Sequence, residues 1–282
     1  MRSGQTRIFD QVLVAVDFSP TGERLHGQLP RLRALGCRRL TLVHVVASVY
    51  GRVPDVSHRD HYQQRLDTLA GSLREDGFEV ETEVTIGPIV TELLRVARDC
   101  QASAILAGSH GHSTLRDLFL GSTALDLIRH ATFPVLLAPI DQSVILPTAG
   151  VCRPLLATDG STAVAAAEAA FMSLLKDCRR GVVVSVGQWN ERPELEAERE
   201  LITAHIQRLE QQAPDPGFDT VLLGEGRPSE EIERVAAERE ADLIIVGKRG
   251  RNPIEDLLLG STAEAVCRHA RRLVLLVPAS SS

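Results

Sequence analysis

Apolar residues recur along the chain in short continuous runs separated by longer amphipathic stretches, and this pattern occurs twice. Continuous runs are typical of strands covered on both faces, whereas apolar residues spaced three and four apart indicate helices. We therefore predict five strands in each half of the chain. They cover residues 12–17, 40–46, 79–85, 103–107 and 134–138, and then residues 154–159, 182–186, 219–223, 242–246 and 273–277.

Helical patterns fill the intervals between these strands. In the first half the predicted helices begin near residues 18–20 and cover about 59–76, 89–97 and 123–130; in the second half they begin near residues 160–162 and cover about 194–212, 232–236 and 262–269. Alternating strands and helices favour parallel sheets with helices on both faces. The predicted fold class is therefore α/β, with two doubly wound, five-stranded parallel sheets in tandem.

The length of the chain agrees with two domains. At ~100–200 residues per domain, 282 residues are enough for two separate cores. The polar segment 141–150, which contains Pro147, is the expected linker. We place the domains at residues 1–142 and 150–282, and we expect them to pack against each other because the linker is short.

A glycine pattern occurs once in each half. It reads G-x-x-G-x9-G-S-T and covers residues 108–123 and residues 247–262. Each glycine of the second copy lies at the same distance along the chain from its counterpart in the first. Each copy follows a predicted strand and precedes a predicted helix, so its glycines lie at the carboxyl edge of a sheet, where open α/β sheets bind ligands.

Glycine at this edge lets the backbone approach a bound group closely, and a helix start offers N–H groups and hydroxyls to an anion. The residues predicted to hold phosphate are Gly108, Gly111, Gly121, Ser122 and Thr123, together with Gly247, Gly250, Gly260, Ser261 and Thr262. The alternative is that the glycines only form tight turns and bind no ligand.

An acid ends the first apolar run of each half, Asp17 in one and Asp159 in the other. A carboxylate there can accept hydrogen bonds from sugar hydroxyls while the glycine loop receives phosphate. The alternative is that both acids only cap the helices that follow them. His44 lies inside an apolar strand and is expected to be a hydrogen-bonded core residue, not a base.

Together these features resemble the universal stress protein family in its tandem two-domain form. The resemblance rests on the acid after the first strand, the Leu-Val-His-Val-Val second strand, the glycine pattern and a closing Pro-Val-Leu-Leu strand, and it covers about residues 9–139 and 152–278. It implies a flavodoxin-like fold for each domain. It also implies a stress-response protein that binds ATP, with or without Mg²⁺, across the carboxyl ends of the first, second and fourth strands.

Carried over residue by residue, the resemblance implies one nucleotide site in each half. Asp17 would bond the ribose, and backbone groups around Ala15 and Val45 would meet the adenine. The matching positions in the second half are Asp159, Ala157 and Val186. In the second half Ser185 stands at the position of His44 and Thr158 at that of Val16, so different side chains would border the adenine in the second site.

The two glycine loops differ in charge. His110 and His112 of the first loop correspond to Arg249 and Arg251 of the second. If these side chains turn toward phosphate, the second site should prefer triphosphate at every ordinary pH. The first should tighten toward pH ~6 as histidine protonates. The alternative is that all four side chains point to solvent.

Charge and composition argue against several other classes. A net charge of −6 and a pI near 5.9 give no electrostatic footprint for nucleic acid. No apolar segment approaches the ~18 residues of a membrane span and the first residues show no signal-peptide pattern, so a cytoplasmic protein is expected. The five cysteines are scattered and odd in number, which predicts reduced, mostly buried or half-buried thiols in place of a disulfide framework or a zinc site.

Three classes of function are compatible with these patterns. The preferred one is an ATP-binding regulatory protein that signals its bound state to an unidentified protein partner. The others are an enzyme that slowly hydrolyses ATP or transfers a nucleotidyl group, and an interaction protein whose sites have lapsed. The chain lacks a Walker pattern and a positioned base, so at most a weak ATPase is expected. The apolar closing strands are expected to pair into an internal pseudo-dimer, and the chain to form a homodimer.

Overall fold

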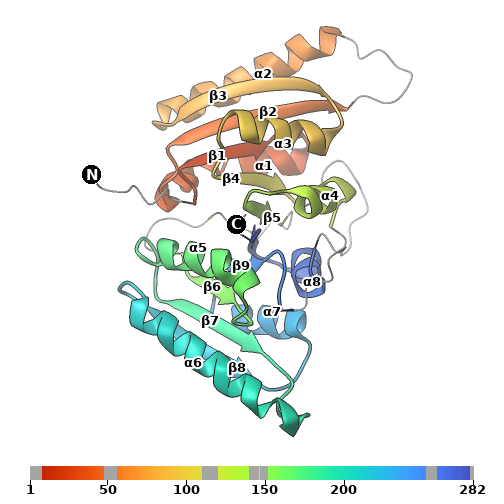
Figure 1. Cartoon of the computed structure of the whole chain (residues 1–282). Coiled ribbons are helices and arrows are strands. Elements are labelled where there is room, and N and C mark those ends of the chain that lie inside the picture. Colours follow the sequence, from red (N-terminus) through yellow and green to blue (C-terminus); the bar gives the residue numbers. More distant parts are fainter. Residues whose placement is uncertain are drawn as a thin grey trace. The chain divides into compact units, whose positions relative to one another are not determined.

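The computed structural model describes residues 8–47, 56–109, 120–139, 146, 152–251 and 259–279. The chain divides into two compact units, Met1–Leu146 and Pro147–Ser282, and the division falls inside the segment expected as a linker. We call these unit 1 and unit 2. Their elements run from red to yellow-green and from green to blue in Figure 1.

Unit 1 contains one five-stranded parallel sheet with the order β3-β2-β1-β4-β5. Its strands are β1 (Gln11–Ala15), β2 (Arg39–Ala47), β3 (Glu79–Gly87), β4 (Ala104–Gly108) and β5 (Val135–Ala138). Its helices are α1 (Pro20–His26), the 3₁₀ helix η1 (Leu29–Leu35), α2 (Val56–Glu75), α3 (Ile89–Asp99) and α4 (Ser122–His130). In Figure 1, α3 lies in front of the strands and α2 behind them, so both faces of the sheet are covered.

Unit 2 repeats this arrangement with the order β10-β9-β6-β7-β8, again parallel throughout. Its strands are β6 (Pro154–Ala157), β7 (Gly181–Val186), β8 (Phe218–Leu223), β9 (Leu243–Gly247) and β10 (Leu273–Val277). Its helices are η2 (Thr162–Val164), α5 (Ala165–Leu175), η3 (Pro193–Leu195), α6 (Glu196–Gln212), α7 (Pro228–Glu238) and α8 (Ser261–His269).

The prediction of two tandem, doubly wound, five-stranded parallel sheets is confirmed. The strand order in both units is that of the first five strands of the Rossmann arrangement, whereas flavodoxin itself has the order 2-1-3-4-5. Both orders reverse direction once, and it is this reversal that creates a ligand-binding position.

The two acids lie beyond the strands that were expected to contain them. β1 ends at Ala15 and β6 at Ala157, so both acids belong to the loops that follow. The physical reason is a left-handed residue directly after each acid: Phe18 has a φ of 53° and Gly160 a φ of 70°. That conformation turns the chain out of the extended geometry of the sheet.

Corresponding helices bury corresponding residues. Leu93, Val96 and Ala97 of α3 are buried, as are Ile232, Val235 and Ala236 at the same spacing in α7. This i, i+3, i+4 spacing places three side chains on one face of a helix, and that face packs on the sheet. The predicted apolar face of α7 is therefore confirmed. In α3 the buried face includes Val96, whereas Ile89 and Leu94, which were expected on it, are half-buried.

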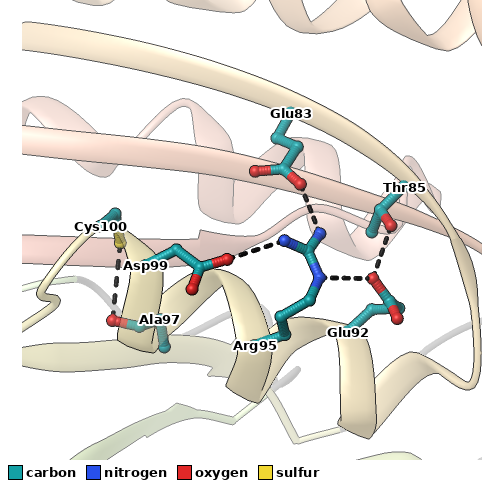
Figure 2. Close-up of polar contacts among 7 residues, drawn as sticks. All are labelled: Glu83, Thr85, Glu92, Arg95, Ala97, Asp99 and Cys100. Atoms are coloured by element: carbon teal, nitrogen blue, oxygen red, sulfur yellow. Dashed lines mark hydrogen bonds and ion pairs between the residues drawn. The ribbon is translucent and has the colours of Figure 1, made fainter.

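Arg95 ties α3 to the edge strand β3 (Figure 2). Its guanidinium pairs with Glu83 of β3 at 2.6 Å and with Glu92 and Asp99 of its own helix at 3.0 and 2.8 Å. Glu92 also accepts a hydrogen bond from the Thr85 hydroxyl at 2.7 Å, and Thr85 and Arg95 together lower the pKa of Glu92. The network leaves the edge of the unit 1 sheet charged, which discourages pairing with other strands.

None of the helices within the described ranges carries an apolar stretch long enough to cross a membrane.

Candidate functional site

The strand order places each acid beside its glycine loop. From β1 the chain moves outward through β2 and β3, then returns to the other side of β1 to form β4, and unit 2 does the same around β6 and β9. In unit 1 the switch point lies between β1, which Asp17 follows, and β4, which ends at Gly108. In unit 2 it lies between β6, which Asp159 follows, and β9, which ends at Gly247. Open α/β sheets bind ligands outside the carboxyl ends of the strands at such a point.

In unit 2 the Asp159 carboxylate holds the glycine loop. Its Oδ1 accepts from the backbone N–H of Ser161 at 2.9 Å, and its Oδ2 accepts from the backbone N–H of Arg251 at 2.6 Å. A Cβ atom at Gly250 would lie 2.7 Å from that Oδ2, which is closer than real Cβ contacts come. A side chain at position 250 would therefore displace the Asp159 carboxylate that holds the loop.

The Arg251 side chain turns back onto its own unit. Its guanidinium donates to the Asp159 carbonyl at 2.6 Å and pairs with Glu198 of α6 at 2.8 Å. Arg251 is exposed, as in the solvent-facing alternative, and its ion pair also joins the loop to α6. The local cause is the Asp159–Arg251 backbone bond, which brings the guanidinium next to acceptors.

The two ends of each glycine loop are joined by the same hydrogen bond in both units. The N–H of Gly260 donates to the Lys248 carbonyl at 2.9 Å, and the N–H of Gly121 donates to the Ser109 carbonyl at 2.8 Å. A Cβ atom at Gly260 would lie 3.3 Å from the Lys248 carbonyl oxygen. This close backbone contact sets the start of the following helix over the end of the fourth strand of its unit.

Both helices that start here begin without a side-chain cap. Gly121 precedes α4 and Gly260 precedes α8, and neither helix start receives a hydrogen bond from the side chain at its N-cap position. The first N–H groups of a helix have no partner within the helix, and they attract anions. Ser122, Thr123 and Ser261 are exposed and Thr262 is half-buried, so the residues predicted to meet phosphate border solvent.

Lys248 adds a cation to the second loop. The ammonium is half-buried, and burial, reinforced by the charge of Arg249, lowers its pKa to about 8. The sequence pattern treated this position as a spacer between two glycines. Its charge was visible in the sequence, but its burial was not.

Ser161 supplies an unpartnered polar atom to unit 2. Its Oγ is buried and makes no hydrogen bond within the described structure. The matching serine of unit 1, Ser19, donates to Asp17 at 2.9 Å and caps α1 by accepting from the N–H of Gly22 at 3.0 Å. The Asp-x-Ser spacing common to both halves was the signal that could have identified these serines.

In unit 1 Asp17 does not itself cap α1, which was the alternative role expected for it. Ser19 is the cap of α1, and Asp17 orients it by accepting from both its N–H and its hydroxyl. His110, Gly111 and His112 lie outside the described residues. Gly108, the last residue of β4, is therefore the described start of this loop.

The positions expected to meet adenine lie on neighbouring strands. Ala15 ends β1 beside Val43 of β2, two residues before Val45, and Ala157 ends β6 beside Val184, two residues before Val186. Ala15, Val45 and Val186 are half-buried, whereas Ala157 is buried. Backbone groups of both strands therefore reach the same edge of the sheet.

An aromatic cluster that the sequence did not predict covers this edge in unit 1. The Phe18 ring stacks on Tyr62 of α2 with centroids 5.8 Å apart, and Arg65 of α2 lies 4.1 Å above the Phe18 ring. The ring centroids of His44 and Tyr62 lie 4.1 Å apart, and the Nδ1 atom of His44 lies 2.7 Å from the carbonyl oxygen of Val16. The interpretation of His44 as a hydrogen-bonded core residue is confirmed.

Unit 2 has a polar network in place of this cluster. Gly160 takes the left-handed position of Phe18, and the nearest side chains are Ile202 and His205 of α6. Glu168 of α5 accepts from the Thr158 hydroxyl at 2.6 Å and lies 2.8 Å from His205 Nε2. The two candidate sites therefore share the hydrogen bond that joins the ends of the glycine loop and differ in the side chains around it.

Comparison with known proteins agrees with these features. Residues 9–139 and 155–278 each match the Universal stress protein family. Universal stress protein Rv2623 of Mycobacterium tuberculosis is 25% identical over an alignment of 301 positions, gaps included, that covers 98% of this chain and 98% of that protein. Universal stress protein Rv2005c of the same organism is 30% identical over 220 residues, which cover 72% of this chain and 70% of that protein.

A solved structure shows the same fold over nearly the whole chain. The crystal structure of a universal stress protein from Archaeoglobus fulgidus has a TM-score of 0.72 at 21% identity and covers 96% of this chain and 99% of that chain. The family match lies on both units and includes the described acids, loop glycines and helix starts of each. The chain belongs to the universal stress protein family, with two domains of that family in tandem.

Proposed function

We propose that each unit binds one adenine nucleotide, ATP with or without Mg²⁺, at its switch point. The observation that carries this proposal is the glycine loop of unit 2, which Asp159 draws across the end of β6. The loop brings backbone N–H groups and the uncapped start of α8 to one edge of the sheet. Bound there, ATP supplies a polyphosphate anion whose charge these groups can complement.

The residues present fit such a ligand. Gly247, Gly250 and Gly260 keep a backbone surface that any Cβ atom would crowd, and the buried Ser161 Oγ has an unmet capacity for hydrogen bonds. In the proposed arrangement the start of α8 and Arg249 face phosphate. Asp159, which accepts two hydrogen bonds already, has lone pairs left for a sugar hydroxyl.

In unit 1 the proposed set is Asp17, Ala15 and Val45 for the nucleoside and Gly108, His110, Gly111, Gly121, Ser122 and Thr123 for phosphate. The shared Gly121–Ser109 and Gly260–Lys248 bonds support equivalent loops. We further propose that the chain works in the cytoplasm as a stress-response regulator and not as an enzyme, and that its nucleotide state is read by a protein partner.

Calorimetry with glycine variants tests the proposal. The intact chain should bind about two ATP molecules, and Gly121→Val or Gly260→Val should each remove one of them, because a branched side chain fills the place that phosphate needs. Gly71→Val is the matched control, since a Cβ atom at Gly71 meets nothing within 4 Å. Circular dichroism checks that each variant is folded.

A second measurement needs no added ligand. Absorbance and mass analysis of the supernatant of heat-denatured, freshly purified protein should reveal adenine nucleotide. Absence of bound nucleotide together with no calorimetric binding would leave the chain as an interaction protein. Release of ADP from added ATP by the intact chain, reduced in each glycine variant and lost when the two substitutions are combined, would instead establish the weak ATPase.

A further inference from the structure

Two cysteines of unit 2 meet at the edge of the sheet opposite the candidate nucleotide site. The backbone N–H of Arg179 donates to the Cys152 carbonyl at 2.8 Å, just before the strand pairing that begins with Leu155 beside Val182. Cys178 directly precedes Arg179, so the main chains of the two cysteines are neighbours. Their side chains lie close enough that each thiol shifts the pKa of the other.

The pair is almost enclosed. Cys152 is 0% exposed and Cys178 is 8% exposed. Cys178 lies in the turn between α5 and β7, whereas Cys152 leads directly into β6. Of these two thiols, Cys178 is therefore the one that a small oxidant can reach from outside.

The other half of the chain provides an internal comparison. Arg38 donates to the Asp10 carbonyl in unit 1 as Arg179 donates to Cys152 in unit 2, and Cys37 precedes Arg38 as Cys178 precedes Arg179. The position facing Cys37 is therefore held by Asp10, which is not a thiol. Burial raises the pKa of Cys37 to about 12, so that this cysteine stays protonated.

The contact between the two thiols makes them unequal. The interaction with Cys152 lowers the pKa of the Cys178 thiol, whereas the interaction with Cys178, together with burial, raises that of Cys152. Burial and the carboxylates of Asp177 and Asp242 act against the lowering at Cys178. The thiolate is the reactive form of cysteine, so the partly exposed member of the pair is also the better nucleophile.

We propose that Cys152 and Cys178 are a peroxide-oxidised pair that closes into a disulfide within unit 2. The Cys178 thiolate attacks a hydroperoxide, the O–O bond breaks, and Cys178 becomes a sulfenic acid while hydroxide, or an alcohol after proton uptake, leaves. The Cys152 sulfur then attacks the sulfenic sulfur, an S–S bond forms, and water leaves with the proton of Cys152. Overall two thiols lose two electrons and two protons, and the peroxide is reduced to two molecules of water, or to water and an alcohol.

The bond would enclose a functional segment. Residues 152–178 contain β6, the Asp159 loop and α5, so oxidation would tie both ends of the segment that carries the acid of the second site. A cross-link that closes a loop restricts the unfolded chain. Unit 2 should therefore resist unfolding more strongly in the oxidised form.

Thiol mapping of the intact chain tests the proposal. The protein is treated with hydrogen peroxide, the remaining thiols are alkylated, and the peptides are identified by mass spectrometry. Two of the five thiols should escape alkylation, and the peptides with Cys152 and Cys178 should be joined with the loss of two hydrogen atoms. Dithiothreitol should restore all five thiols.

Single variants separate the two roles. Cys152→Ser should leave Cys178 as a sulfenic acid that dimedone traps, Cys178→Ser should leave Cys152 unreactive, and Cys37→Ser should change nothing. The proposal is overturned if peroxide oxidises Cys37, Cys100 or Cys267 as fast as Cys178. It is also overturned if Cys178 passes to the sulfinic acid in the intact chain without forming the cross-link. Circular dichroism of each variant distinguishes a lost reaction from a lost fold.

Discussion

The Oδ2 atom of Asp159 accepts a 2.6 Å hydrogen bond from the backbone N–H of Arg251, a residue 92 positions later in the chain. This bond joins the loop after the central strand of unit 2 to the glycine loop after its neighbour. The acid therefore acts first on the protein itself: it shapes the surface on which a nucleotide is proposed to bind.

Asp159→Asn should weaken ATP binding to the second site. One side of the amide cannot accept from an N–H group and the charge is lost, so a charge-assisted bond worth ~1.5–3 kcal/mol disappears, which is roughly tenfold or more in affinity. Calorimetry on the full chain measures both sites. Asp17→Asn is the matched control and should weaken only the first site; equal two-site binding by the Asp159 variant would exclude the carboxylate from the site.

Lys248→Met should stabilise unit 2 at pH 7. Below pH 8 the lysine is protonated in both the folded and unfolded states, so the folded state carries the cost of a half-buried charge. Because folding lowers its pKa from 10.5 to about 8, this cost fades as the pH rises between these values. The difference in unfolding free energy between the variant and the wild type should thus shrink from pH 8 to pH 10.5.

Urea unfolding at a series of pH values measures that difference. Lys176→Met is the control, because Lys176 is exposed and its replacement should leave the stability of unit 2 nearly unchanged at every pH. A gain in stability that stays constant from pH 7 to pH 10.5 would show that apolar packing, and not the charge, is responsible.

Gly160→Ala should destabilise unit 2 by about 1–2 kcal/mol. The residue has a φ of 70°, and a Cβ atom there would lie 2.9 Å from Cδ1 of Ile202. Gly71→Ala, in the interior of α2 with open space around the added atom, should instead stabilise unit 1 by roughly 0.5–1 kcal/mol. Thermal unfolding compares the two; a neutral Gly160 variant would mean that Ile202 moves away at no cost.

Phe18 has the same left-handed backbone conformation in unit 1 as Gly160 in unit 2, but its side chain makes stabilising contacts. Its ring contacts with Tyr62 and Arg65 stabilise unit 1, whereas its φ of 53° is unfavourable for any residue with a Cβ atom. Phe18→Ala loses the contacts and keeps the strain, so it should lower the unfolding free energy more than Phe18→Gly, by about 1 kcal/mol. Equal losses in both variants would show that the backbone is unstrained.

The closing strands should pair between the two units. β5 and β10 each stand at one end of the strand order of their own unit, and both consist of apolar residues. Such an edge needs a partner. Amide hydrogen exchange should show strong protection along both strands, and sedimentation should show a compact particle that dimerises. Rapid exchange in both strands and independently tumbling halves would contradict the internal pseudo-dimer.

The strands, the paired helix faces and the repeat could be predicted because they depend on local patterns. Leu93, Val96 and Ala97 share one helix face through their spacing alone, and Ile232, Val235 and Ala236 repeat it. The glycine pattern indicated where the chain would leave the sheet, since glycine at a strand end followed by a helix start is a local signal. These features require no knowledge of distant contacts.

Other features of the protein depend on contacts between residues far apart in the sequence, and local patterns do not predict them. The partners of Arg251, the burial that lowers the pKa of Lys248, the unpartnered Ser161 hydroxyl and the meeting of Cys152 with Cys178 all arise where separate elements converge. The physical reason is that the period of apolar residues records which face of an element is buried, but not which polar groups the neighbouring elements bring to that place. Local patterns in the sequence were enough to predict two domains, each with a candidate ligand-binding edge. The contacts between distant segments give the second domain a loop held by Asp159 and a pair of thiols at the opposite end of the sheet.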